Sequence, residues 1–311
     1  MRRSLPGLLL AACLLAGCGT GQTAAPSGTP SGTRSPSAPA TSPTKTSPAP
    51  TSAAPPAPSA PSTTTAPATP SHEPAPGTTP PAWLGKRVLP RTADGFGEVR
   101  PTPAVMRVRR WNTPDTVAPL PGTGFTARVV SPAPADVIAR STWRPGCPVG
   151  KQDLAWVRMA YRGFDGARHS GEMLVNASVA DDVVGVFRRL YRARFPIESM
   201  GITTKADQDA PPTGDGNVTG AFACRPVRGS TTFSQHAYGL AIDLDPFQNP
   251  YHRGDLVLPE LASSYLDRGW VRPGMITPDG PAVRAFAAIG WGWGGTWSSL
   301  KDFQHFSQNG R

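Results

Sequence analysis

Large apolar residues are concentrated in a short run near the N-terminus and in residues 83–311, with a polar stretch between them. Residues 18–82 consist mostly of Pro, Ser, Thr and Ala. Such a stretch cannot bury enough surface to offset the entropy lost on ordering, and its prolines favour extended chain. We therefore expect a disordered linker, followed by one domain in residues 83–311, a length that allows a substantial core.

The pattern within the domain predicts a mixture of strands and helices. Residues 83–135 are rich in Pro, Gly and Thr without a clear period, so we expect an irregular arm laid over a compact part, residues 136–311. Residues 171–176 predict a strand, and the apolar face of residues 181–193 predicts a helix. Further strands are expected at 195–200, 240–244 and 301–306, and helices that open on proline at 259–268 and 281–289, while residues 152–161 fit either type. This mixture indicates an α+β fold, a small antiparallel sheet flanked by helices.

The N-terminus has the features of an export signal. Arg2 and Arg3 precede a short apolar run that is too short to span a membrane as a mature helix. The run ends in Leu-Ala-Gly-Cys, which resembles a bacterial lipobox, in which Cys18 is lipidated and residues 1–17 are removed. We expect an extracytoplasmic protein, anchored by lipid to the cell membrane and reaching into the cell wall. The alternative is an ordinary signal peptide cut nearby.

The cysteines and the charge agree with export. Cys147 and Cys224 are the two cysteines of the domain, and a lone pair in an exported protein is most simply a disulfide. The alternative is two buried thiols. The chain carries a net charge of +10, which suits an anionic wall polymer as partner. Nucleic acid is not expected, because the chain is exported and has no run of Lys or Arg.

Two segments carry residues that can hold a metal ion. Residues 234–243 read Ser-Gln-His-Ala-Tyr-Gly-Leu-Ala-Ile-Asp, and residues 302–306 read Asp-Phe-Gln-His-Phe. His236, Asp243 and His305 can bind one zinc ion and leave a position open for water, which is the pattern of a catalytic site. Gly239 permits a bend that would bring Asp243 beside His236. Asp245 competes for the same role, since alternate residues of a strand share a face.

Asp302 lies three residues before His305. A carboxylate near a zinc ion that does not bind it can accept the proton of the bound water and pass it to the leaving amine, so we expect Asp302 to be the catalytic base. We expect His169 and His252 to have no role in metal binding. The tryptophan-rich run 291–297 could stack on a glycan, but core and turn structure is the simpler interpretation.

These motifs resemble those of the zinc D-alanyl-D-alanine carboxypeptidases and L-alanyl-D-glutamate endopeptidases, a group related to lysostaphin-type peptidases and the hedgehog signalling domain. The resemblance covers residues 140–306 and is strongest at 217–251 and 291–306. It implies zinc binding by His236, Asp243 and His305, with Asp302 as the base. It also implies that Arg225 binds a substrate carboxylate and that Ser234 lines the cleft.

The resemblance implies a zinc peptidase that acts on peptidoglycan stem peptides, with D-alanyl-D-alanine carboxypeptidase as the first choice. An L-alanyl-D-glutamate type endopeptidase and a non-catalytic wall-binding module are the alternatives. Two departures bear on this choice. The carboxypeptidases generally use Glu as the base, whereas this chain has Asp302, and many relatives have an acidic residue where Ser307 stands. We expect the protein to be a monomer.

Overall fold

The structure, a computed structural model, describes residues 77–227 and 230–311. The expected signal peptide, the lipid site at Cys18 and the linker as far as residue 76 lie outside the described residues. Among the described residues, no helix is both long enough and apolar enough to cross a membrane.

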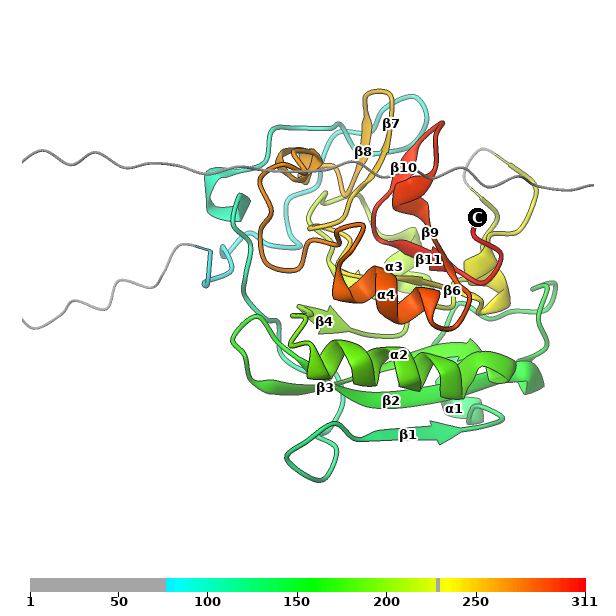
Figure 1. The fold of residues 1–311 in the computed structure, drawn as a ribbon. Helices are drawn as coiled ribbons and strands as arrows, with labels where there is room; N and C mark the ends of the chain where they lie inside the picture. The colour runs from blue at the N-terminus through cyan, green and yellow to red at the C-terminus, as the bar shows by residue number, and fades with distance from the viewer. Residues whose placement is uncertain (1–76, 228–229) are drawn as a thin grey trace, which may run out of the picture. The chain divides into compact units, whose positions relative to one another are not determined.

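The largest sheet is a three-stranded antiparallel one, covered on one face by helices. It contains β1 (Ala127–Val130), β2 (Leu154–Arg162) and β3 (Arg168–Asn176) in the order β1-β2-β3. Helix α2 (Ala180–Arg192) lies along β2, and α4 (Pro281–Ala287) packs against α2 (Figure 1). Acidic residues in the first turn of α2 and basic residues in its last turn complement the helix dipole.

The main core lies between this sheet and the two helices. Alternate residues of β2 point into it, as the period of two in a strand requires, and they meet the apolar face of α2. The residues involved include Val157, Met159, Tyr161, Met173, Val175, Val183, Phe187, Leu190 and Phe286. The apolar pattern predicts α2 at residues 181–193, within one residue of each observed end.

Three smaller sheets complete the fold. Strands β6 (Ala241–Asp243), β11 (His305–Ser307) and β9 (Gly292–Trp293) form an antiparallel sheet in the order β6-β11-β9, and β10 (Lys301–Asp302), β7 (Tyr251–Arg253) and β8 (Leu256–Leu258) form another in the order β10-β7-β8. Strands β4 (Ser199–Met200) and β5 (Val218–Thr219) form a short parallel pair. The α-helices not yet named are α1 (Ala135–Ala139) and α3 (Lys205–Asp209). The expected α+β class is confirmed.

Three expected elements are wrong in type or extent. Residues 259–268 contain only a short 3-10 helix, η5 (Ser263–Leu266), because Tyr265 and Leu261 are drawn into a second core cluster with Met106 and Phe247. Residues 301–306 are not one strand: the chain turns at Phe303 and Gln304, so that β10 pairs with β7 and β11 pairs with β6 and β9. Of residues 195–200, only Ser199 and Met200 are in a strand.

The segment that precedes β2 is closely packed against the rest of the domain. Residues 83–135, where we expected an irregular arm, include a 3-10 turn, η1 (Ala104–Met106), and the whole of β1. The Arg109 side chain is fully buried, and Trp111 is also buried. This segment therefore contributes to the core as well as to the surface.

Candidate metal centre and cleft

His236 is positioned by a short 3-10 helix, η4 (Gln235–Tyr238). The Ser234 hydroxyl caps this helix by accepting a hydrogen bond from the His236 backbone N–H at 3.4 Å. Gly239 ends it in the left-handed conformation with φ of 69°. Its backbone packs so closely on β3 that an added Cβ would lie 2.5 Å from the Asn176 nitrogen. Only glycine fits here, and the bend sends the chain directly into β6.

Asp243 and His305 face one another across two strands. They occupy the same register position in the antiparallel pair β6–β11. On the other edge of β6, Asp243 exchanges two backbone hydrogen bonds with Gly220, at 2.9 and 3.1 Å. Both edges of the short strand are thus paired at Asp243, which fixes the direction of its side chain.

The three side chains place their donor atoms at the corners of a small triangle. His236 Nε2 lies 3.1 Å from His305 Nδ1, and Asp243 Oδ1 lies 3.1 Å from His305 Nδ1 and 3.3 Å from His236 Nε2. Tetrahedral zinc with bonds of about 2.0–2.1 Å requires donor atoms roughly 3.3–3.4 Å apart. Among the described residues, these three form the group of His, Cys, Asp and Glu side chains that could hold a metal ion.

The hydrogen bonds behind the imidazoles direct their lone pairs into this triangle. His236 Nδ1 lies 2.6 Å from the Ala221 carbonyl oxygen, and His305 Nε2 lies 3.4 Å from the Arg311 carbonyl oxygen. A carbonyl only accepts, so these nitrogens carry the protons and the other two are free to bind a cation. Two lone pairs and a carboxylate at such short range repel one another unless a positive charge, a proton or a metal ion, lies between them.

The three candidate ligands shift one another's pKa values. Burial alone would raise the pKa of Asp243, but the positive charge and hydrogen bonding of His236 and His305 lower it below its usual range. Burial tends to lower the pKa of His305, and the Asp243 carboxylate outweighs this and raises it. Asp243 is therefore ionised at neutral pH, as a metal-binding carboxylate must be.

Asp302 lies at the end of β10, close to this group but outside it. Burial and the negative charge of Asp243 raise the pKa of Asp302 to about 7. Its Oδ1 atom is buried and has no hydrogen-bond partner among the described residues. Gly294 packs against it, since an added Cβ there would lie 2.6 Å from the Asp302 carbonyl oxygen. A carboxylate with one buried, unpaired oxygen next to a metal site can exchange protons near neutral pH.

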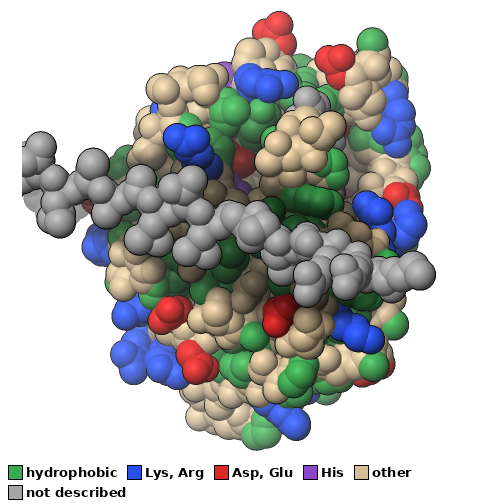
Figure 2. All heavy atoms as spheres, turned by 90° about the vertical axis from the view of Figure 1, so that its right-hand side faces the viewer, with side chains coloured by type: hydrophobic (Ala, Val, Ile, Leu, Met, Phe, Trp, Pro, Cys, Tyr) green, Lys and Arg blue, Asp and Glu red, His purple; other side chains and the backbone are tan. Residues whose placement is uncertain are grey.

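A cavity of about 550 Å³ opens beside the candidate ligands. His236, Asp243 and Arg225 line it, together with residues of α3 and apolar residues that include Val218 and Val227. Figure 2 shows histidine and acidic side chains recessed near the centre of this face, with Lys and Arg side chains spread around them. The cavity is large enough to hold part of a peptide.

The residues expected to bind substrate are placed differently from one another. Arg225 lines the cavity. Its positive charge offsets part of the rise in the Asp302 pKa that burial and Asp243 cause. Ser234 is buried and is not among the residues that line the cavity, so its observed role is to cap η4 at His236.

Cys147 and Cys224 form the expected disulfide, which ties the segment carrying Arg225 to the loop after α1.

Asp245, the rival ligand, points away from the centre. The expectation that it shares a face with Asp243 is wrong, because β6 ends at Asp243 and Asp245 has a φ of 43°. Its Oδ1 instead accepts a hydrogen bond from the Glu198 backbone N–H at 3.0 Å. His169 also lies outside the centre, with its ring nitrogens 2.8 Å from Asp115 and 3.1 Å from Asp165.

Other outcomes concern residues for which the sequence held little local signal. The tryptophans at 291 and 293 are buried in the main core, as the simpler interpretation proposed.

Two backbone groups that the sequence did not indicate support candidate ligands. The Ala221 carbonyl contacts His236, and the Gly220 backbone pairs with Asp243. The role of a backbone group cannot be inferred from the types of side chain. Only the closeness in sequence of residues 220–221 to the first motif could have suggested that they support the ligands.

Comparison with known proteins finds one family that resembles the segment carrying the candidate site. Residues 228–308 match the family model described as D-alanyl-D-alanine carboxypeptidase. The matched segment contains His236, Asp243, Asp302 and His305, while Arg225 lies just before it. No curated protein and no solved structure gives a significant match to the chain. The resemblance of the two motifs to the D-alanyl-D-alanine carboxypeptidases is confirmed over these residues.

Proposed function

We propose that the protein is a zinc-dependent carboxypeptidase that removes the terminal D-alanine from peptidoglycan stem peptides, since residues 228–308 match the family model described as D-alanyl-D-alanine carboxypeptidase. The match supports a metallopeptidase of the D-alanyl-D-alanine carboxypeptidase type. The identity of the metal, the bond that is cut and the roles of single residues are the proposal.

The observation that carries the proposal is the donor triangle of His236, Asp243 and His305. Its sides of 3.1–3.3 Å fit one tetrahedral ion, and three protein ligands leave the fourth position for water. When bound, zinc would polarise the scissile carbonyl and lower the pKa of its water to about 7. Two nitrogens and one carboxylate oxygen are a donor set that zinc accepts well.

The remaining steps belong to the side chains around the triangle. Asp302 accepts a proton from the attacking water through its unpaired oxygen and returns it to the leaving amine. Arg225, on the wall of the cavity, binds the terminal carboxylate of the substrate with its planar fork. Ser234 holds the start of η4 in place, because its hydroxyl accepts a hydrogen bond from the His236 backbone N–H.

One observation favours an L-alanyl-D-glutamate type endopeptidase as the second candidate. The base is Asp302 rather than Glu, which resembles the endopeptidase branch of the group. A non-catalytic wall-binding module is less consistent with the site, because a carboxylate oxygen buried without a hydrogen-bond partner is costly, and a binding module gains nothing from keeping one.

We further propose that the protein works outside the cytoplasm, held to the membrane by lipid on Cys18, with residues 19–82 as a tether to the wall. The supporting features are the lipobox-like sequence and the composition of the linker. The disulfide is consistent with an oxidising compartment.

The proposal is tested by metal analysis and by digestion of purified muropeptides, with the products weighed by mass spectrometry. We expect about one zinc per chain and products that have lost one alanine residue. His236→Ala should lose both zinc and activity. His252→Ala is the matched control, since His252 is half-buried on β7 and outside the donor triangle, and it should keep both. Products split between L-alanine and D-glutamate would favour the second candidate, and unchanged zinc in His236→Ala would refute the site.

A further inference from the structure

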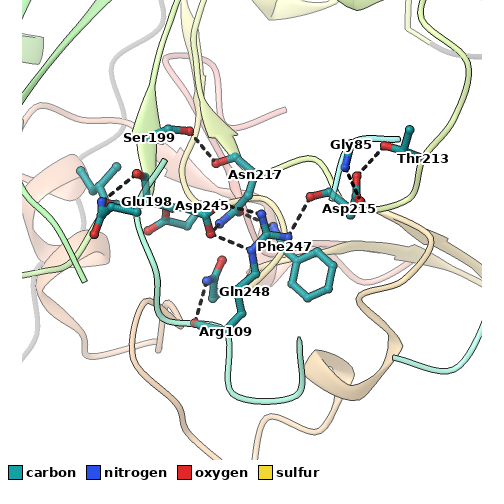
Figure 3. A network of polar contacts seen from close by, with 12 residues as sticks. Gly85, Arg109, Glu198, Ser199, Thr213, Asp215, Asn217, Asp245, Phe247 and Gln248 are labelled. Atoms are coloured by element: carbon teal, nitrogen blue, oxygen red, sulfur yellow. Dashed lines mark hydrogen bonds and ion pairs between the residues drawn. The ribbon is translucent and has the colours of Figure 1, made fainter. Parts of the chain in front are cut away.

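Arg109 is the centre of a buried polar network (Figure 3). Its guanidinium donates to both oxygens of Glu198, at 2.7 and 2.6 Å, and to the Asp215 carbonyl oxygen at 2.8 Å. The side chains of Arg109 and Glu198 are only 2% and 1% exposed. The Arg109 backbone is also held, because its N–H donates to the Tyr265 hydroxyl and its carbonyl accepts from Gln248.

The network reaches the chain that follows the ligand strand β6. The Glu198 backbone N–H donates to Asp245 Oδ1 at 3.0 Å. The Glu198 carboxylate accepts from Asn217 Nδ2 at 2.7 Å, and Asn217 Oδ1 accepts from the Phe247 N–H at 2.7 Å. Glu198 thus holds residues 245–247 from two sides, directly and through Asn217 (Figure 3).

The turn held in this way is one that the chain would not adopt alone. Asp245 has a φ of 43°, a conformation that residues other than glycine rarely take unless their surroundings impose it. It lies two residues after Asp243, in a strand of three residues that ends there. If the turn relaxed, the last residue of β6 would be the first to lose its alignment.

The buried ion pair is not explained by stability alone. Removing two charges from water costs about as much as their attraction returns, so such pairs are often no better than apolar side chains of the same size. Residues that orient metal ligands from behind, in contrast, typically change metal affinity by about 10–100-fold when they are replaced. Arg109 and Glu198 also lie outside residues 228–308, the segment that matches the family model.

We propose that Arg109 is a positioning residue for the metal centre. Its ion pair with Glu198 holds the turn at Asp245, and the turn aligns the Asp243 carboxylate with the two imidazoles. The N-terminal part of the domain, which supplies Arg109, thereby completes a site whose ligands all come from the C-terminal part. The inference rests on the proposed metal site.

The test is the Kd for zinc of the folded protein, measured by competition with a chelator at a temperature where every variant is fully folded. We expect Arg109→Met to raise the Kd by about 10–100-fold. The control is Arg140→Met, which breaks the bidentate pair of Arg140 with the buried Glu172 on β3, outside the cavity lining. It should lower the melting temperature and leave the Kd unchanged, because a merely structural loss does not reach the ligands.

A second variant keeps the test decisive if Arg109→Met does not fold. Arg109→Met/Glu198→Met removes both charges, so no unpaired charge is left in the core, and it should show the same rise in Kd. A folded variant of either kind with the wild-type Kd would overturn the positioning role while leaving the metal site intact. A wild-type protein that binds no zinc would overturn the proposed function as well, so the two failures can be told apart.

Discussion

At the scale of single residues, the candidate metal centre contains two kinds of side chain. Three would bind the ion, and one, Asp302, would move a proton. Asp243 and Asp302 are both half-buried carboxylic acids, but their pKa values are shifted in opposite directions. The two imidazoles lower the pKa of Asp243, whereas burial and the charge of Asp243 raise that of Asp302 to about 7. Two neighbouring acids with such different affinities for protons are suited to different tasks.

This difference leads to a prediction for Asp302→Asn. The amide keeps the size of the side chain but cannot accept a proton, so turnover should fall by about 10²–10⁴-fold, the usual contribution of general acid–base catalysis. Zinc content should stay at the wild-type level, since the triangle of His236, Asp243 and His305 is untouched. Muropeptide turnover and metal analysis on the same preparation measure both.

Asp243→Asn is the matched comparison for that variant, because it makes the same chemical change at a residue of the triangle. It should weaken zinc binding and turnover together. If Asp302→Asn lost its zinc, Asp302 would have to be counted among the ligands. If it kept near-normal turnover, another group would have to be the base.

At the scale of elements, the turn between η4 and β6 determines where His236 and Asp243 meet. Gly239→Ala places a Cβ 2.5 Å from the Asn176 nitrogen and 2.9 Å from the Val175 carbonyl carbon, and neither backbone atom can move freely. We expect the free energy of unfolding to fall by about 2–4 kcal/mol, the sum of left-handed strain and overpacking. Zinc affinity should fall as well, since the clash displaces the element that carries His236.

Gly254→Ala separates the cost of the left-handed conformation from the cost of the steric clash. Gly254 has a φ of 56° in the loop between β7 and β8, and an added Cβ meets nothing within 4 Å. Denaturant unfolding should show a loss of only about 1 kcal/mol, the cost of the left-handed conformation, with unchanged zinc affinity. Equal losses in the two variants would mean that the contact with Asn176 contributes nothing.

The disulfide gives a second prediction at this scale. It links residues 77 positions apart and fixes the segment that carries Arg225 and the Ala221 carbonyl. Cys147→Ala/Cys224→Ala should lower the free energy of unfolding by about 2–4 kcal/mol, chiefly because the unfolded chain becomes less constrained. Denaturant unfolding measures this, with wild-type protein in reducing agent as the comparison.

Free-thiol counting provides an independent check on protein that begins after Cys18. Unreduced, unfolded protein should show no free thiol. Two titratable thiols, or a double variant as stable as the wild type under oxidising conditions, would contradict the role assigned to the bond.

Elements with strong local patterns could be predicted from the sequence, and those fixed by distant contacts could not. Helix α2 was predicted within one residue at each end because its apolar face repeats with the period of a helix. The 3-10 helix at Ser263–Leu266 was not, because the burial of Tyr265 against the N-terminal segment outweighs the preference of Pro259 for a helix start. The single strand expected at 301–306 failed for a similar reason, since its halves pair with different partners.

The candidate site shows the same division. The donor atoms of His236, Asp243 and His305 come from two short motifs, so residue type and spacing were enough to select them. The choice between Asp243 and Asp245 could not be made from strand alternation, because alternation assumes that the strand continues beyond Asp243. Arg109 left no signal at all, since a single arginine acquires its role from the fold.

At the scale of the whole molecule, the domain is larger than the segment that matches the family model. The match spans residues 228–308, whereas strand β1 and the buried Arg109 come from residues before 136. Segments far apart in the sequence thus share one core. The boundary that the composition suggested at residue 136 would cut through it.

The last prediction concerns this boundary. A fragment of residues 136–311 would lose β1, which pairs with β2 at four positions, and would leave the buried Glu198 carboxylate without Arg109. An unpaired buried charge alone costs about 3–5 kcal/mol, and a domain has only about 5–15 kcal/mol of stability in total. We expect this fragment to show no cooperative thermal unfolding by circular dichroism, whereas residues 77–311 should unfold in one sharp transition. A fragment starting at 136 that melts cooperatively at the same temperature would show that the preceding segment is an accessory arm, and the support of Asp243 would then have to come from Gly220 and β11 alone.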